Sequence, residues 1–326
     1  MIRRFLIWIL LLVMVSVGSL VYYSLRPLSL EILPLEFDLK QGSSLKTAAR
    51  ELQQAGILGQ DWPFVLLVRL LGAAGEIKAG SYSLTYNLSP LELAQMITRG
   101  DVNLRQVRIV EGWAFGQMRE ALNASPYLAH DSLELTDAQL LQAIGAPESH
   151  PEGLFFPDTY HFATGTSDLD IYRHAYETMQ RKLQEAWETR DPDLPMATPY
   201  QVLILASIVE KETGAPFDRT KIAGVFVNRL KIGMMLQTDP SVIYGIGPQF
   251  DGNLRKRDLL QDNPYNTYRR AGLTPTPISL PGSDAINAAV HPAHTDALYF
   301  VARGDGTSYF SSNLNEHNQA VNRFQK

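Results

Sequence analysis

The sequence predicts an α+β protein with an N-terminal transmembrane helix, a small α/β module and a larger mixed α+β domain. Three observations support this prediction. Residues 5–25 form an apolar run without a charged side chain. Residues 30–86 change between strand-like and helix-like patterns, in the order strand, helix, helix, strand. From Glu111 onward the helical patterns become longer and aromatic residues become more frequent.

Length and charge exclude several classes of protein. The chain has 326 residues, which is enough for about two domains. Its 29 Lys and Arg against 34 Asp and Glu give a net charge of -5, so we expect no nucleic-acid partner, which would need a basic surplus. With no cysteine, the chain has no disulfide framework, no Cys-zinc site and no thiol nucleophile.

The apolar run at residues 5–25 predicts a membrane anchor, because a bilayer core takes about 20 such residues in a helix. Arg3 and Arg4 precede the run, which predicts a cytoplasmic N-terminus. The alternative is a cleaved signal peptide that ends near Ser19. The anchor is favoured because apolar sequence continues past that point. Both interpretations export the rest of the chain.

The module after the anchor is predicted element by element. Residues 30–39 form an edge strand because they contain Pro34, and a helix follows with Leu45, Ala48, Ala49 and Leu52 at helical spacing. A second helix covers residues 61–71, and residues 76–86 alternate like a strand. Ser89 and Glu92 form a capping box that opens a helix to about Thr98, and residues 102–110 return to a strand.

The larger domain is predicted to contain three clear features. Thr136 with Gln139, and Thr198 with Gln201, have the spacing of capping boxes. Ser167 begins a long helix with an apolar stripe. The stripe consists of Leu169, Tyr172, Tyr176, Met179, Leu183 and Trp187. Near the end of the chain, two short β-rich segments around Asp305 and Gly306 predict a hairpin.

The helix after Pro199 is the strongest candidate for chemistry. Seven of its residues are strongly apolar, which predicts a buried helix, and it ends in Glu210, Lys211 and Glu212. Burial raises the pKa of a carboxyl and suits it to donate a proton. Spacing alone does not choose between the two glutamates, and both could be ordinary exposed charges.

Two polar clusters have the side chains that a sugar site needs, with hydrogen-bonding groups for hydroxyls and flat rings for pyranose faces. Turn formation is the simpler explanation for either cluster alone, because both contain a proline after Asp or Asn. The first comprises Gln237, Thr238, Asp239 and Tyr244. The second lies in NPYNTYRRAG and contains Tyr265, Asn266 and Tyr268.

Metal and cofactor chemistry is not indicated. His291 and His294 flank Pro292, which breaks the helix on which a ligand pair would sit, and His317 lies downstream. The sequence contains no H-E-x-x-H motif, no phosphate-binding glycine loop and no G-x-S-x-G motif. We therefore expect no metal and no cofactor.

Five segments together resemble the YceG-like family of membrane-bound endolytic murein transglycosylases. They are PEGLFFPDTYHF (151–162), LASIVEKETG (205–214), VFVNRLKIGMMLQTDPSVIYGIG (225–247), NPYNTY (263–268) and HPAHTDALYFVARGDGTSYFSSNLNEHN (291–318). The resemblance covers nearly the whole chain, with the segments in the expected order.

The resemblance implies an organisation and a reaction. It implies an anchor at 1–26, a LysM-like module with connecting strands at 27–110 and a catalytic domain at 111–326. It implies cleavage of the β-1,4 bond between N-acetylmuramic acid and N-acetylglucosamine within glycan strands, leaving 1,6-anhydro ends. It assigns the catalytic acid to Glu210. The expected substrate-binding residues are Gln237, Thr238, Asp239, Tyr244, Tyr265, Asn266, Tyr268, Glu152 and Asp158.

The same resemblance implies a location and partners. We expect a single-pass protein of the bacterial inner membrane with a periplasmic catalytic domain, peptidoglycan strands as substrate and peptidoglycan synthases as partners. The expected role is to terminate or trim nascent strands. The alternative function is a non-catalytic, membrane-anchored peptidoglycan-binding scaffold, which would not require a carboxylate in an apolar helix.

Overall fold

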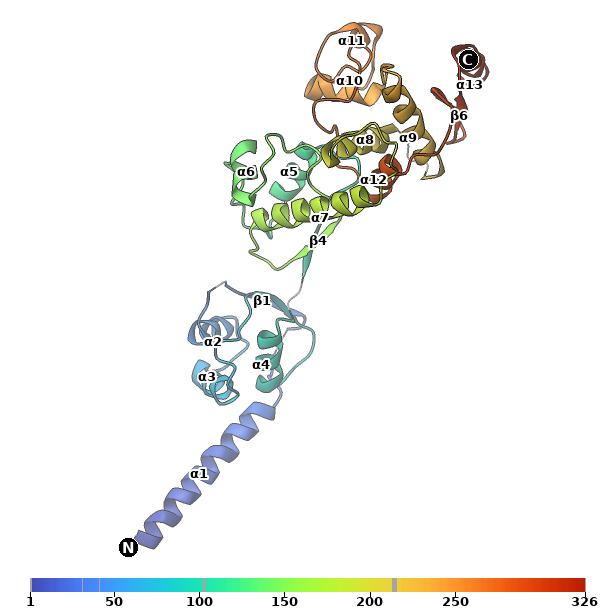
Figure 1. Cartoon of the computed structure of the whole chain (residues 1–326). Helices are drawn as coiled ribbons and strands as arrows, with labels where there is room; N and C mark the ends of the chain where they lie inside the picture. The colour runs from blue at the N-terminus through green and yellow to red at the C-terminus, as the bar shows by residue number, and fades with distance from the viewer. Residues whose placement is uncertain (1, 31, 41, 102–103, 213–215, 326) are drawn as a thin grey trace. The chain divides into compact units, whose positions relative to one another are not determined.

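The computed structural model describes residues 2–30, 32–40, 42–101, 104–212 and 216–325 (Figure 1). The chain divides into two compact units. The first unit contains residues 1–106, 127–129 and 161–166. The second contains residues 107–126, 130–160 and 167–326. Both helices and strands occur, which confirms the α+β class.

The first helix, α1 (Ile2–Leu25), is the predicted apolar segment. Within the described residues it is the one helix that is long and apolar enough to cross a membrane. Its apolar side chains are exposed, with Trp8 71% and Leu12 69% accessible. A largely exposed helix with this composition fits a single-pass anchor or a signal sequence.

The first unit has the predicted order of strand, helix, helix, strand. The elements are β1 (Leu35–Leu39), α2 (Leu45–Gln54), α3 (Asp61–Leu70) and β2 (Gly80–Leu84). The two strands pair antiparallel, with Phe37 opposite Tyr82. Strand β1 begins only after Pro34, so it is shorter than the predicted 30–39.

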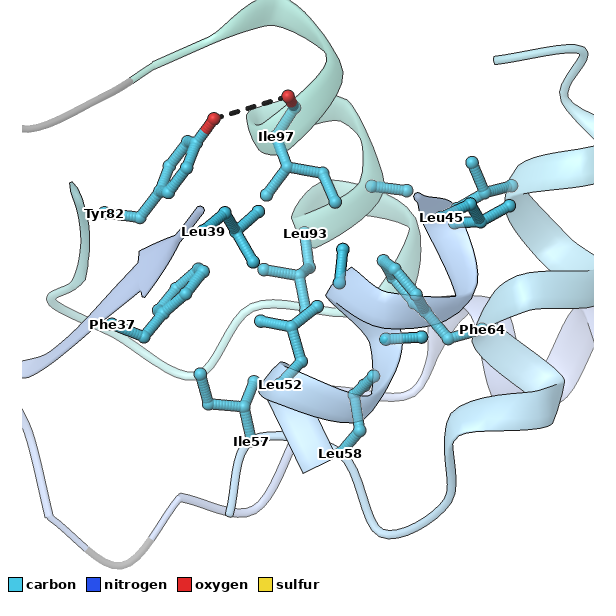
Figure 2. Packing of buried hydrophobic residues seen from close by; sticks show 14 of the residues in the cluster. Phe37, Leu39, Leu45, Leu52, Ile57, Leu58, Phe64, Tyr82, Leu93 and Ile97 are labelled. Carbon is cyan, nitrogen blue, oxygen red and sulfur yellow. Dashed lines mark hydrogen bonds between the residues drawn. The ribbon is translucent and has the colours of Figure 1, made fainter. Parts of the chain in front are cut away.

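Figure 2 shows the core of this unit, which both strands and all three of its short helices build. Phe37 and Tyr82 stack with their ring centroids 5.3 Å apart. The Tyr82 hydroxyl donates to the backbone oxygens of Lys78 at 2.7 Å and Ile97 at 3.4 Å. The residues predicted to share one face of this helix are buried in this core, which confirms the prediction from their spacing. They are Leu45, Ala48, Ala49 and Leu52.

Two further predicted elements follow. Helix α4 (Pro90–Arg99) begins with the predicted capping box, in which Ser89 accepts from the Glu92 amide and Glu92 accepts from the Ser89 amide. Strand β3 (Arg105–Arg108) pairs with β4 (Thr159–Phe162). The predicted strand at 102–110 includes residues 102 and 103, which lie outside the described residues.

The second unit is mostly helical and is built around α8 (Pro199–Glu212). Residues 202–209 of α8 are all buried, as its apolar sequence predicted. Helix α8 packs against α7, α9, α10 and α12. The other helices are α5 (Phe115–Asn123), α6 (Asp137–Ile144), α7 (Asp168–Glu188), α9 (Pro216–Lys231), α10 (Asp239–Ile246), α11 (Lys256–Leu260), α12 (Ser283–Val290) and α13 (Leu314–Phe324).

The predicted caps and hairpin of this unit are present with one difference. Thr136 and Gln139 form a complete capping box. Thr198 accepts from the Gln201 amide, but the Gln201 side chain accepts from the Ala197 amide, one residue before the expected partner. Strands β5 (Tyr299–Ala302) and β6 (Ser308–Ser311) form the predicted antiparallel hairpin.

Candidate active site

Glu212, the last residue of α8, lines a cavity of about 650 Å³. Gln237, Asp239 and Tyr268 from the two predicted polar clusters line the same cavity. The Thr238 hydroxyl donates a hydrogen bond to the Glu212 carboxyl group. One glutamate and most of the first predicted cluster therefore meet at one concave site, which is the expected form of a ligand pocket.

A buried threonine holds the first cluster in place. The Thr267 hydroxyl accepts from the Thr238 amide at 3.0 Å, and the Thr267 backbone oxygen accepts from the Gln237 amide at 3.1 Å. The Ser241 hydroxyl lies 2.8 Å from the same Thr267 hydroxyl. The two predicted clusters thus fix each other, although 26 or more residues separate these partners in the chain.

Gln237 has an unusual backbone conformation. Its φ angle is +50°, and it is the one described non-glycine residue with positive φ. Such a conformation is uncommon for an L-residue and is retained where surrounding bonds enforce it. Here the bond to Thr267 enforces it, and Gln237 lines the cavity.

The pKa of Glu212 is raised to about 7, chiefly because burial disfavours the carboxylate. The negative charge of Asp239 raises this pKa further. The Thr238 hydrogen bond and the positive charge of Arg229 act in the opposite direction. Glu212 is therefore protonated in a substantial fraction of molecules near neutral pH, which a general acid requires.

The opposite wall of the cavity comes from the end of the chain and was not predicted. Tyr299 and His317 stack there with ring centroids 5.1 Å apart. Buried Arg229 lies beneath, with its guanidinium 5.3 Å from the Tyr299 ring. Arg229 donates to the backbone oxygens of Leu298 at 2.7 Å and Leu236. An arginine that follows the apolar segment VFV, as in VFVNRL, was the available signal.

Glu210 has a different environment from Glu212. It does not line the cavity, and its side chain is only 7% exposed. One carboxylate oxygen accepts from the Gly282 amide at 2.9 Å, and the other lies 3.6 Å from the guanidinium of Arg219. Burial raises the pKa of Glu210, while the Gly282 amide and Arg219 counteract this. These partners tie the end of α8 to the start of α12.

Glu152, Tyr244 and Tyr265 form a separate cluster, in which Glu152 is buried and the two tyrosines are half-buried. The Glu152 carboxyl group accepts from the Phe115 amide at 3.0 Å, at the start of α5. Burial raises the pKa of Glu152 to about 7. The rings of Tyr244 and Tyr265 meet edge to face, 4.9 Å apart. None of the three lines the cavity of Glu212.

Two other predicted site residues also lie outside the cavity. Asn266 is fully buried, and its side-chain amide donates to the backbone oxygens of Leu259 at 3.1 Å and Gln261 at 2.6 Å. It therefore fixes the loop that carries Tyr268. Asp158 is exposed, and its carboxylate accepts from the adjacent Thr159 amide at 2.7 Å.

The histidines do not form a metal centre in the part of the chain that the structure describes. No group of three or more His, Asp or Glu side chains there could hold a metal ion. His291 pairs instead with Asp191, with Nδ1 3.0 Å from the carboxylate. His317 contributes a ring to the cavity wall.

The chain is similar to a known family and to individual proteins. A model of the YceG-like family matches residues 37–323. An endolytic murein transglycosylase of Bacillus subtilis (strain 168) is 32% identical over 307 residues, which is 89% of this chain and 84% of the relative. The endolytic murein transglycosylase of Streptococcus pneumoniae serotype 2 is 27% identical, covering 95% of this chain and 63% of the relative.

A solved structure is also similar. The crystal structure of a protein from Listeria monocytogenes, described as YceG-like, superimposes with a TM-score of 0.53 and 28% sequence identity. The match covers 87% of this chain and 98% of the other.

Proposed function

This chain belongs to the YceG-like family, and from that premise we propose that it cuts peptidoglycan strands internally, with Glu212 as its catalytic group. Its relatives are named endolytic murein transglycosylases, so the chain is a lytic transglycosylase of peptidoglycan rather than a scaffold. The observation that carries the assignment of Glu212 is its place on a polar cavity with a pKa of about 7.

The first step requires a proton donor. Protonated Glu212 donates its proton to the glycosidic oxygen between N-acetylmuramic acid and N-acetylglucosamine as the bond from C1 to this oxygen breaks. An oxocarbenium-like transition state develops on the muramoyl ring. A carboxyl group with a pKa near ambient pH suits this role, since it is both protonated often enough and acidic enough.

The second step uses the same residue as a base. The resulting Glu212 carboxylate takes the proton of the muramoyl C6 hydroxyl, whose oxygen bonds to C1 of the same sugar. The products are a 1,6-anhydro end and a free N-acetylglucosamine hydroxyl, and no water is consumed. Because the attacking hydroxyl belongs to the same sugar, little entropy is lost in positioning it. One carboxyl group can therefore perform both proton transfers.

Glu212 is favoured over Glu210 by its surroundings. The resemblance assigned the acid to Glu210, but that side chain is engaged by Arg219 and the Gly282 amide. An acid must touch its substrate, and Glu210 does not line the cavity. Glu212 meets the side chains that suit a sugar, so we assign Glu210 a structural role.

The other cavity residues have roles in substrate binding. We assign Gln237, Asp239 and Tyr268 to hydrogen bonds with sugar hydroxyl and acetamido groups. The Tyr268 hydroxyl donates to the Asp239 carboxylate at 2.6 Å, which fixes the carboxylate beside Glu212. Thr238 orients Glu212 itself. Glu152, Tyr244 and Tyr265 are assigned a supporting role outside the cavity.

The site is proposed to lie outside the cytoplasm. Arg3 and Arg4 precede the apolar run of α1, and basic residues beside a span are retained on the cytoplasmic side. The catalytic unit would then lie in the periplasm of an inner membrane, where peptidoglycan synthases release new strands. We propose that the enzyme ends or trims these nascent strands.

The first unit is proposed to be a LysM-like module, within domain limits of 1–26, 27–110 and 111–326. The support is the order β1, α2, α3, β2 with antiparallel pairing of the two strands. A module of this kind would bind the glycan strand that the catalytic unit cuts.

The reaction type can be tested in water enriched in heavy oxygen. The purified full chain should cut glycan strands without incorporating solvent oxygen, because the C6 hydroxyl and not water attacks C1. Mass spectrometry of the fragments measures the incorporation. New ends that contain solvent oxygen would identify a hydrolase and would require a second catalytic carboxylate.

Asp239→Asn should move the pH profile of the enzyme. Loss of the negative charge at Asp239 favours the Glu212 carboxylate, so the pKa of Glu212 falls. Glu212 then loses its proton at a lower pH, so the descending limb of the pH profile of kcat/KM should shift to lower pH. Tyr268→Phe is the matched control, because it removes the hydrogen bond to Asp239 but retains the charge. An unchanged limb in Asp239→Asn would contradict the role of Glu212 as acid.

A further inference from the structure

Helix α3 exposes a continuous apolar stripe. Trp62, Leu66 and Leu70 are 62%, 41% and 66% exposed. They are spaced by four residues and therefore lie on one side of the helix. Phe64, Leu67 and Val68 of α3 are buried, and Phe64 and Val68 belong to the core of the first unit. A row of large exposed apolar side chains on a folded domain indicates an interaction surface.

The stripe belongs to a helix that contacts the end of α1. Helix α1 packs against both α3 and α4 within the first unit. Its reduced exposure is confined to Leu20, Tyr23 and Ser24, while the rest of the described span is exposed. Helix α3 therefore lies at the level of the last turns of α1. In a membrane-spanning α1 this level is the boundary between acyl chains and headgroups.

The charges beside the stripe complement lipid headgroups. A groove of about 330 Å³ runs along α3, and its charged lining residues are Lys46, Asp61 and Arg69. Asp61 is paired with Arg50 at 3.8 Å, so the balance of the groove and its edge is positive. Trp62 and Leu66 line the same groove. Basic groups beside exposed Trp and Leu are typical of surfaces that bind an anionic membrane interface.

We propose that the stripe of α3 inserts into the headgroup region of the outer leaflet, where Lys46 and Arg69 contact lipid phosphates. This rests on the proposed topology of α1. The first unit then contacts the membrane at two places, the end of α1 and the exposed side of α3. These two contacts fix the orientation of the unit on the bilayer surface. Trp62 is the interfacial aromatic of this second contact.

The test uses the full chain in vesicles of phosphatidylethanolamine and phosphatidylglycerol. The chain has no cysteine, so Leu66→Cys introduces a single attachment site for a polarity-sensitive fluorophore. Glu36→Cys is the matched control, because Glu36 is exposed on β1 and alternates with residues that face the helices. We expect blue-shifted emission and several-fold stronger quenching by lipid-borne quenchers at position 66 than at position 36.

Two outcomes would overturn the proposal. Equal quenching at the two positions would show that the stripe stays in water, and shielding of position 66 from both water and lipid quenchers would show that protein covers it. The charge contribution is tested with Lys46→Glu/Arg69→Glu, which should weaken quenching at position 66. Protection of α1 from added protease and retained glycan cleavage, measured on the same samples, report separately on the anchor and on the catalytic function.

Discussion

Glu212→Gln should reduce the rate of glycan cleavage by a factor of about 10²–10⁴, which is the usual contribution of one general acid or base. We expect the upper end of this range, because one carboxyl group performs both proton transfers. Glutamine keeps the shape of the side chain and can still accept from the Thr238 hydroxyl, so folding should be retained. The initial rate of fragment release from isolated glycan strands measures the loss, and unchanged thermal unfolding confirms the fold.

Glu210→Gln is the control within the same helix. It changes the same functional group two residues away, but it lies at the contact with Arg219 and the Gly282 amide. We expect cleavage to remain within about tenfold of the unchanged enzyme, because the proton transfers do not use this residue. Loss of cleavage in a folded Glu210→Gln variant would identify Glu210 as the catalytic acid.

The largest expected effect on stability comes from Arg219→Met. Arg219 is 7% exposed and lies between Glu210 and Asp284, at 3.6 Å and 3.0 Å. Its loss leaves the buried Glu210 without its cation, while Asp284 is exposed and stays solvated. Removing one member of a buried pair costs about 3–5 kcal/mol, and we expect the lower end because the Gly282 amide still holds Glu210. Denaturant unfolding measures the change.

The double variant Glu210→Gln/Arg219→Met should recover most of that loss, because it removes both charges together. The double-mutant cycle gives the coupling between the two residues directly. The loss in Arg219→Met should also become smaller as the pH is lowered, because burial raises the pKa of Glu210 and protonation removes its unpaired charge. A coupling near zero would contradict the structural role assigned to Glu210.

The secondary structure of the first unit was predictable because local signals agree. Alternation marked the strands, the spacing of Leu45, Ala48 and Leu52 marked α2, and the capping box of Ser89 marked the start of α4. The elements without such signals were missed. The short helices α11 and α12 and the pairing of β3 with β4 depend on contacts between distant parts of the chain, which no local pattern contains.

The residue types of the site were predictable, but their grouping was not. Gln237, Asp239 and Tyr268 line one cavity, whereas Tyr244, Tyr265 and Glu152 lie in a separate cluster. The two glutamates at the end of α8 occupy different sides of a helix that is apolar all round. Such a helix has no polar face to show which side meets solvent. Only the packing of α9, the 237–239 loop and the C-terminal hairpin creates a cavity at Glu212.

The most direct measurement of the central claim is the amount of 1,6-anhydro ends that each glutamate variant produces. Isolated glycan strands are digested with the unchanged chain, Glu212→Gln or Glu210→Gln, and the ends are quantified by mass spectrometry. We predict abundant anhydro ends with the unchanged chain and with Glu210→Gln, and almost none with Glu212→Gln. Abundant anhydro ends from Glu212→Gln would contradict the proposal that this carboxyl group carries both proton transfers.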